Sequence, residues 1–405
     1  MYLSNVRLID GTGRVWEQAA IQIEGDRIVA VLDAAEVFTL PEVAGPGSID
    51  IHDLAGKTVL PGLINCHTHL CLDGSADPEG AWKRRSPTEN VLLAAKHAEA
   101  TLQAGITTVR DLGGPEGVDL GLREAVNGGL VPGPRMLVSG QVLCMTGGHG
   151  HLLGGREVDS PDEARKGARE QLKAGADVIK VMATGGVMTP GVEPGAAQLT
   201  MEEMRAAVQE AEKAGKLTAT HAQGTMGIKN AIRAGVDSVE HGIYLDNEAI
   251  DMMLERGTYL VPTLAAVHHI LEAGIEAGIP AFIIEKAERV SEAHVKSFQR
   301  AQEAGVRIAA GNDGGTPFNL GDNLASELEC MAAAGMSPAK ALDAAHRTAA
   351  ELLRMADQIG TVEPGKLADL VVLDADPLAD ISAVRSVHLV IKAGQPVHQP
   401  HRQSG

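Results

Sequence analysis

Short apolar runs alternate with helical stretches through the middle of this chain. Four to eight apolar residues bounded by turn residues are typical of a buried strand, whereas apolar residues spaced three and four apart are typical of a helix. Eight runs have the strand character: Thr58–Ile64, Thr107–Asp111, Arg135–Val138, Val178–Met182, Leu217–His221, Asp237–Glu240, Tyr259–Pro262 and Arg307–Ala310. Helical patterns lie between them, for instance at Asp162–Ala174, Met201–Ala214 and Asn323–Ala334, and Ala-Gly often closes them. Eight strand-then-helix units predict an α/β fold and favour a closed parallel (β/α)8 barrel, the TIM barrel, over an open sheet.

The two ends of the chain follow another pattern, in which short extended runs are separated by turn residues. Near the N-terminus these runs are Ala20–Ile23 and Arg27–Leu32, and near the C-terminus they are Asp369–Leu373 and Val387–Lys392. We expect both ends to pair into one small β-module of residues 1–58 plus 355–405. Residues 59–354 would then form the barrel.

Composition narrows the class of protein. Hydrophobic residues make up 44% of the 405 positions but aromatic residues only 2%, so aliphatic side chains must fill the core. A formal net charge of −18 argues against binding to nucleic acid or to anionic membrane surfaces. The four cysteines form no C-x-x-C pair, and no run of about 20 apolar residues occurs. These features predict free thiols and a soluble, cytoplasmic protein.

Metal-capable residues stand at the ends of the predicted strands. His67 and His69 follow the first strand, and because side chains alternate along a strand, both imidazoles point the same way. His221 and His241 end the fifth and sixth strands, and Asp313 follows the eighth. The carboxyl ends of parallel barrel strands converge on the active-site face, so we expect these five side chains to meet there.

Lys180 lies inside the apolar fourth strand. An isolated buried ammonium group is poorly solvated and needs compensation. One interpretation is a salt bridge to a nearby acid. The other is carboxylation by CO2, because burial lowers the pKa of the amine and the resulting carbamate has two oxygens that can bridge two cations.

These motifs resemble those of the amidohydrolase superfamily over nearly the whole chain. The matching segments are Pro61–His69, Lys180, His221, Glu240–Gly242, Asp313 and Gly360–Leu370, the last resembling the family's return into a small β-sandwich. Within the superfamily the chain resembles the branch of imidazolonepropionase-like proteins, prolidases (Xaa-Pro dipeptidases), arginine/lysine carboxypeptidases and ochratoxin-hydrolysing amidases. Members of that branch with peptidase activity have the lysine of the fourth strand, whereas imidazolonepropionases lack it, so Lys180 favours a peptidase or amidase.

The resemblance implies a centre with two divalent metal ions. His67 and His69 would bind the first ion together with Asp313, His221 and His241 would bind the second, and carboxylated Lys180 would bridge them. Zinc suits imidazole and carboxylate ligands, although manganese or cobalt would also serve. A hydroxide held between the ions would attack the amide carbonyl. Asp313 would be the catalytic acid and base that carries the proton to the leaving nitrogen.

Three further residues are candidates for substrate binding. His149 follows the third strand in a Gly-Gly-His motif that the branch shares, and its imidazole would meet a free carboxylate. Gln223 stands where the family often has His or Tyr; its amide can donate a hydrogen bond but cannot titrate. His268 and His269 follow the seventh strand, where they either read specificity or cap a helix. The Gly- and Pro-rich segment Met182–Leu199 is predicted to be a loop over the pocket.

The favoured hypothesis is therefore a metal-dependent dipeptidase, carboxypeptidase or N-acyl amino acid amidase for small substrates with a free carboxylate. Two alternatives remain open: a cyclic amide or amidine hydrolase or deaminase of imidazolonepropionase type, and a silent protein that acts in interactions. The sequence does not determine the oligomeric state, and a homo-oligomer is compatible with it.

Overall fold

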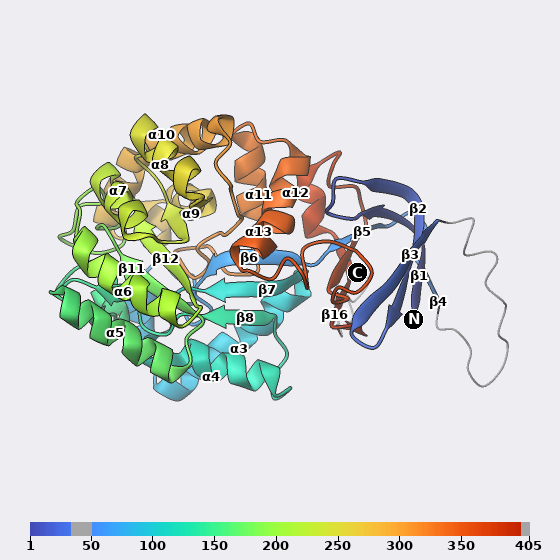
Figure 1. Ribbon diagram of the computed structural model, residues 1–405, viewed down its shortest axis with the longest axis horizontal. Helices are drawn as coiled ribbons and strands as arrows, with labels where there is room; N and C mark the ends of the chain where they lie inside the picture. Colours follow the sequence, from blue (N-terminus) through green and yellow to red (C-terminus); the bar gives the residue numbers. More distant parts are fainter. Residues whose placement is uncertain (34–50, 398–405) are drawn as a thin grey trace.

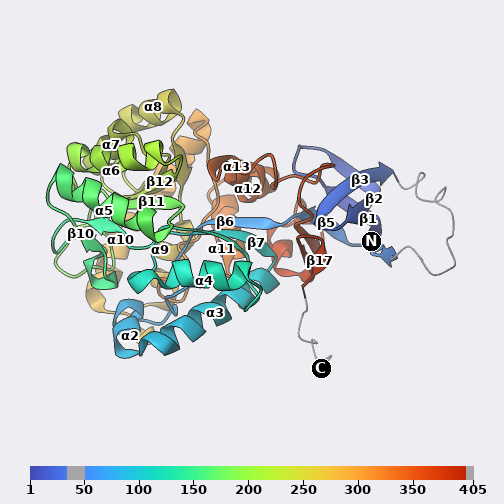
Figure 2. The same ribbon diagram turned by 60° about the horizontal axis from the view of Figure 1, so that its bottom comes forward.

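The computed structural model describes residues 1–33 and 51–397. It has two unequal parts, a large one in which helices surround parallel strands and a small one that contains the N-terminal strands and the last strands of the chain (Figures 1 and 2). The fold is thus mixed α/β, as predicted. None of the helices in the described ranges is both long and apolar enough to cross a membrane. All four cysteines are unpaired, which confirms the prediction of free thiols.

The small part is built on one eight-stranded sheet in which both chain ends take part. Its order is β17-β16-β15-β5-β1-β2-β3, and β4 pairs with β1 off this path. The strands are β1 (Tyr2–Ile9), β2 (Val15–Glu24), β3 (Arg27–Asp33), β4 (Ile51–Asp53), β5 (Thr58–Pro61), β15 (Leu370–Leu373), β16 (Val387–Lys392) and β17 (Gln395–Pro396). Because β15 pairs antiparallel with β5, which runs parallel to β1, strands from the two ends of the chain share one sheet.

The first predicted strand, Thr58–Ile64, is in fact two strands in two sheets. Thr58–Pro61 forms β5 of the small sheet, and Leu63–Thr68 forms β6 of the large part. Gly62 separates them, and a Cβ atom there would lie only 2.1 Å from Oγ1 of Thr107. The chain therefore passes from one sheet to the other at a point where no side chain fits.

The large part contains two groups of parallel strands. One sheet has the order β6-β7-β8 and the other β10-β9-β11-β12-β13-β14. Besides β6 the strands are β7 (Ile106–Asp111), β8 (Arg135–Val138), β9 (Leu143–Cys144), β10 (Arg156–Glu157), β11 (Val178–Met182), β12 (Leu217–Ala222), β13 (Ser238–His241) and β14 (Tyr259–Val261). The backbone N–H of Asp177 donates to the carbonyl of Val138, which links the two sheets on one side.

The eighth predicted strand, Arg307–Ala310, is reduced to a single bridge between Ile308 and Leu260. Its backbone is hydrogen-bonded to Leu260 on one side, and the N–H of Cys66 donates to the carbonyl of Ala310 on the other. The N–H of Ala310, however, donates to the carbonyl of Ala344, outside both sheets. The ladder is interrupted for that reason, although the segment still lies between β14 and β6.

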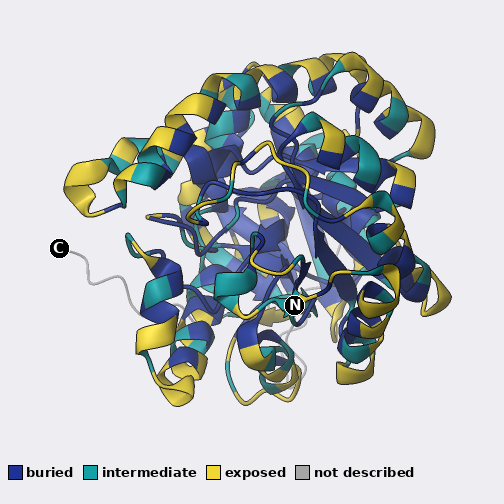
Figure 3. Ribbon diagram, turned by 90° about the vertical axis from the view of Figure 1, so that its left-hand side faces the viewer, coloured by how far each residue is buried: buried dark blue, intermediate teal, exposed yellow. Residues whose placement is uncertain are grey.

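Helices surround the parallel strands, with buried faces inward and exposed faces outward (Figure 3). They are α2 (Pro78–Arg84), α3 (Pro87–Gln103), α4 (Val118–Asn127), α5 (Pro161–Ala174), α6 (Met201–Lys213), α7 (Thr225–Ala234), α8 (Asn247–Arg256), α9 (Leu264–Ala273), α10 (Ala281–Ala304), α11 (Leu324–Ala333), α12 (Pro338–Ala345) and α13 (Arg347–Leu352). Ser86 and Thr200 form capping boxes, and Gly175, Gly235 and Gly305 end α5, α7 and α10 in the left-handed conformation. The predicted role of Ala-Gly as a helix end is thus confirmed at these three positions.

Candidate metal centre

The predicted metal ligands line one cavity at the carboxyl ends of the parallel strands. His67 ends β6, and Lys180, His221 and His241 lie on β11, β12 and β13. His69 follows β6, and Asp313 follows the segment near Ile308. All six line the cavity, as do His149 and Gln223, and most of its remaining lining is apolar.

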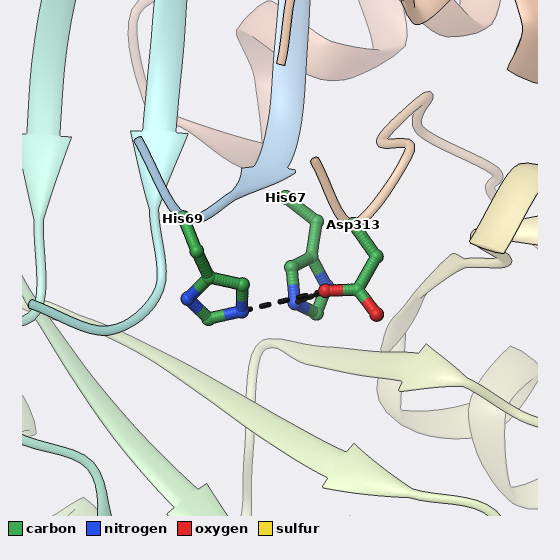
Figure 4. Close-up of side chains that lie close together, drawn as sticks. All are labelled: His67, His69 and Asp313. Carbon is green, nitrogen blue, oxygen red and sulfur yellow. Dashed lines mark ion pairs between the residues drawn. The ribbon is translucent and has the colours of Figure 1, made fainter. Parts of the chain in front are cut away.

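His67, His69 and Asp313 form the tightest group. Oδ1 of Asp313 lies 3.2 Å from Nε2 of His67 and 3.4 Å from Nε2 of His69. Figure 4 shows the two imidazoles and the carboxylate pointing toward one another from two different segments. Their potential ligand atoms all lie within 4.8 Å of one another, so the three residues could hold one metal ion. Burial opposes the charge on Asp313, but the two histidines outweigh it and hold the pKa of the carboxyl well below its usual value.

His221 and His241 continue the group across the cavity. The ring centroid of His241 lies 4.5 Å from that of His221 and 5.3 Å from that of His67. Burial holds the pKa values of His221 and His241 well below the usual range, with Lys180 adding to the effect. Both rings are therefore neutral near pH 7, which is the state in which imidazole binds a metal ion.

Each of the four histidines has one ring nitrogen held by a supporting group of the protein, and the second nitrogen of His67 and of His69, Nε2, faces the candidate ligand Asp313. Nδ1 of His67 meets Glu240 at 2.9 Å, and Nδ1 of His69 meets the carbonyl of Gly113 at 3.3 Å. Nε2 of His221 meets the carbonyl of Gly185 at 3.0 Å, and Nδ1 of His241 meets Oγ1 of Thr263 at 2.6 Å. Metal-binding histidines commonly hold their second nitrogen in this way, because it fixes the tautomer and the ring orientation.

Lys180 is almost completely buried, with 2% of its surface exposed. Among the described residues its Nζ has neither a hydrogen-bond partner nor a salt bridge, so no acid there makes the salt bridge that was one interpretation of the sequence. Burial lowers the pKa of the amine to about 8, although Glu240 and Asp313 oppose the shift. A substantial neutral fraction is therefore available near neutral pH for reaction with CO2.

A buried ion pair between Arg110 and Glu240 contacts Nδ1 of His67 and orients its ring. Nη2 of Arg110 donates to Oε1 of Glu240 at 2.9 Å, and Oε2 of the same carboxylate faces His67. Arg110 also donates to the carbonyl of Cys66 and to Oγ of Ser238. Burial raises the pKa of Glu240, but Arg110 and His67 outweigh it, so the pKa is lowered and the side chain stays charged.

His241 has its own supporting chain of contacts. Thr263, its partner, has a positive φ of 54° immediately before α9. Glu327 of α11 accepts hydrogen bonds from the N–H groups of Leu264 and Ala265 at 2.9 and 2.7 Å. A buried carboxylate thus caps the helix whose first turn positions Thr263 against His241.

Two of the three candidate substrate-binding residues line the cavity of the metal centre, and the third does not. His149 and Gln223 line the cavity, and the ring of His149 lies 4.1 Å from that of His221. Burial lowers the pKa of His149 to about 3, so its imidazole is neutral and offers a hydrogen bond instead of a charge. His268 does not line this cavity; it is half-exposed on α9, 3.8 Å from Glu272, beside a second cavity lined by Leu264 and Cys330.

Sequence reasoning missed several residues of the centre. Arg110 and Glu240 are charged residues inside predicted strands. A charge inside an apolar strand is the feature that drew attention to Lys180, so the same feature could have indicated the supporting roles of Arg110 and Glu240. No local pattern marks Thr263, Glu327 or the cavity-lining Glu79, because their neighbours in space are distant in sequence. The predicted loop Met182–Leu199 does contribute Val187 and Met188 to the lining.

Comparison with known proteins identifies the class. The model of the amidohydrolase family matches residues 58–397, and the chain belongs to that family. It is 32% identical to an ochratoxinase of Aspergillus niger over an alignment that covers 92% of this chain and 81% of the relative. The resemblance inferred from the motifs is thereby confirmed.

Two solved structures are similar over nearly their whole length. A Xaa-Pro dipeptidase with bound methionine in the active site superposes with a TM-score of 0.89 at 34% identity, covering 98% of this chain and 99% of that chain. A prolidase complexed with N-methylphosphonate-L-proline gives a TM-score of 0.88 at 33% identity, with the same coverage. This chain is a hydrolase that acts on C–N bonds.

Proposed function

We propose that this protein is a dinuclear metallohydrolase that cleaves the amide bond of dipeptides or N-acyl amino acids with a free carboxylate. The observation that carries the proposal is Lys180, a buried amine without a partner among the described residues, in a cavity with four histidines and Asp313. Carboxylation would convert this unfavourable group into an anionic bridging ligand. The similarity to an ochratoxinase and to prolidases supports amide hydrolysis as the reaction.

We infer a closed (β/α)8 barrel and a small β-sandwich built from both ends of the chain, with the boundary between them after Pro61 in place of the predicted one after residue 58. The backbone bonds from Val138 to Asp177, from Leu260 to residues 307–309 and from Ala310 to Cys66 support closure, since they connect the two parallel groups on both sides. The pairing of β5 with β1 and β15 supports a small module that extends to Pro61. Residues 34–50 and 398–405 of that module lie outside the described residues.

The donor set fits two divalent ions, with zinc the best match for imidazole and carboxylate ligands. His67, His69 and Asp313 would hold one ion and His221 and His241 the other, with carboxylated Lys180 between them. The orientation of the four rings supports this assignment, because one nitrogen of each is already bonded to a supporting group and Nε2 of His67 and of His69 faces Asp313. Bound ions would supply Lewis acidity toward water and toward the amide carbonyl.

The protein's own residues would position the substrate and move the proton. Asp313 accepts a proton from the attacking water and delivers it to the leaving nitrogen as the C–N bond breaks. The side chain of Gln223, whose Oε1 is buried and without a hydrogen-bond partner in the described part of the chain, turns its amide toward the carbonyl oxygen. His149, held at Nδ1 by Thr189 at 2.8 Å, offers Nε2 to the free carboxylate.

A substrate screen combined with metal analysis tests this function. Metal-loaded protein is incubated with dipeptides and N-acyl amino acids, and the released amino acid is measured. About two ions per chain are expected together with hydrolysis. About one ion per chain, with hydrolysis confined to cyclic amides or amidines, would instead favour the imidazolonepropionase-type alternative. Metal-free protein serves as the control.

A further inference from the structure

The cavity of the metal centre contains two carboxylates with different surroundings. Asp313 contacts His67 and His69, as described above. The other is Glu79, near the start of α2, with only 7% of its surface exposed. Among the described residues its carboxylate has no hydrogen-bond or ion-pair partner. A carboxylate in this position costs free energy unless a cation or a proton meets it.

The neighbouring cations of the chain do not meet this need. The basic run after Glu79 consists of Lys83, Arg84 and Arg85. Arg84 pairs with Asp77 at 3.1 Å, and Arg85 pairs with Asp73, so two of the three cations are bound to other acids. Lys83 is exposed. Burial therefore dominates and raises the pKa of Glu79 to about 7, although Lys83 opposes the shift.

The rest of the cavity wall has few groups that could bind a positively charged group of a ligand. Its lining is mostly apolar, for example Leu72, Leu153 and Ile270, and within residues 1–33 and 51–397 the one other carboxylate that lines it is Asp313 of the metal centre. A cationic ligand group in this cavity would consequently find one free anionic partner, Glu79. Charge-assisted hydrogen bonds are about twice as strong as neutral ones and are stronger still in a dry site.

We propose that Glu79 is a specificity residue that binds a positively charged group of the substrate, either its α-ammonium or a basic side chain. This inference rests on the proposed function and narrows its substrate class, since dipeptides with a free N-terminus have an ammonium group and N-acyl amino acids do not. It predicts a preference for aminoacyl over acylated substrates where the α-ammonium is the partner, and for basic over neutral side chains where a basic side chain is the partner.

Equilibrium binding tests this inference separately from catalysis. The measurement uses protein with Asp313→Asn, which slows turnover, after elemental analysis has shown that this variant still binds metal ions, and it compares alanyl-leucine with N-acetyl-alanyl-leucine by calorimetry. A second pair, N-acetyl-lysyl-leucine and N-acetyl-norleucyl-leucine, reports on a basic side chain. The ligand with the ammonium group is expected to bind roughly 10- to 100-fold more tightly in at least one pair. Glu79→Gln should remove that preference.

Two control variants isolate the charge of Glu79. Asp77→Asn weakens the cap of α2 and its pair with Arg84 but leaves Glu79 in place, and Glu255→Gln removes an exposed carboxylate on α8. Both should keep the preference. If Glu79→Gln does not fold, Glu79→Asp replaces it, and its shorter side chain should reduce the preference measurably.

The inference is overturned if the protein with Asp313→Asn and an intact Glu79 binds both members of each pair equally, or if it binds none of the four ligands. It is also overturned if the Glu79→Gln variant still binds the ligand with the ammonium group more tightly. Where Glu79→Asp replaces that variant, an unchanged preference for this ligand overturns the inference. Failure of the proposed function has another signature: no hydrolysis of dipeptides or N-acyl amino acids by the protein with Asp313 intact. The binding comparison still decides the role of Glu79 in that case.

Discussion

Oε2 of Glu240 lies 2.9 Å from Nδ1 of His67, while Oε1 of the same carboxylate accepts a hydrogen bond from Arg110. Both carboxylate oxygens are thus committed, one to a candidate metal ligand and one to a fully buried guanidinium group. The strand β13 therefore contributes to the centre twice, through His241 itself and through the residue that orients His67. The position of His67 depends on a residue that would not bind the metal.

We predict that Glu240→Gln weakens metal binding and destabilises the protein. Loss of a group that orients a ligand typically costs 10- to 100-fold in metal affinity. Arg110 would keep its charge without an anionic partner, at a cost of about 3–5 kcal/mol in the free energy of unfolding. Chelator competition and urea denaturation of the metal-free protein measure the two effects.

The matched control is Glu248→Gln, which removes an exposed carboxylate of α8 that pairs with Lys229 and Arg233 of α7. Such a pair contributes less than about 1 kcal/mol, so this variant should retain both stability and metal affinity. Equal behaviour of the two variants would contradict the supporting role of Glu240.

Lys180→Ala is expected to abolish activity and to lower the number of bound ions, because the bridge between the ions is removed. Short carboxylic acids or bicarbonate should restore part of the activity by occupying the vacated site. Elemental analysis and turnover are measured on the same preparation. A variant that kept both ions and normal turnover would exclude the carbamate.

Assembly of the centre should depend on pH through the same residue. The pKa of Lys180 is lowered to about 8, so the amine is mostly protonated at pH 7 and mostly neutral at pH 9. Only the neutral amine reacts with CO2. Metal-free protein given metal ions and a fixed concentration of dissolved CO2 should therefore regain activity faster as the pH rises from 7 to 9. A rate that fell over this range would contradict carboxylation of Lys180.

Asp313→Asn should fold normally, since the side chain keeps its size, but turnover should fall by roughly 10²- to 10⁴-fold as the proton carrier is lost. The low pKa of this carboxyl means that it is ionised throughout the neutral range. Steady-state kinetics measure the effect, and thermal unfolding monitors the fold. Turnover close to that of the unaltered protein would require another proton carrier.

His149→Ala should lower kcat/KM for substrates with a free carboxylate more than for the same substrates blocked as amides, because a charge-assisted hydrogen bond to the carboxylate is lost. The ratio of kcat/KM for the free acid to that for the amide is the quantity to compare between the two proteins. A collapse of the surrounding loop would lower both values alike and leave the ratio unchanged. Equal hydrolysis of free and blocked substrates by the unaltered protein would remove the carboxypeptidase interpretation.

The sequence predicted the strands and helices well where one local pattern determined them. The predicted helices Asp162–Ala174, Met201–Ala214 and Asn323–Ala334 agree within one residue at each end with α5, α6 and α11. The two misjudged strands have tertiary causes. Thr58–Ile64 is divided because its two halves pair with different strands, β5 with β1 and β15 and β6 with β7. The ladder at Arg307–Ala310 is interrupted because Ala344 accepts a backbone hydrogen bond.

The sequence by itself determined which side chains capable of metal chemistry end the parallel strands, because strand periodicity and chain direction fix that placement locally. Only the tertiary structure decided which of them meet, which nitrogen of each imidazole is held by a supporting group, and that Lys180 has no salt-bridge partner in the described chain. The tertiary structure also placed Arg110, Thr263, Glu327 and Glu79 at or next to the metal centre, and it placed His268 at a second cavity. The physical reason is that hydrogen bonds and desolvation depend on distances between residues far apart in the sequence, such as Asn65 and Asn312, which are 247 positions apart, and no local pattern encodes those distances.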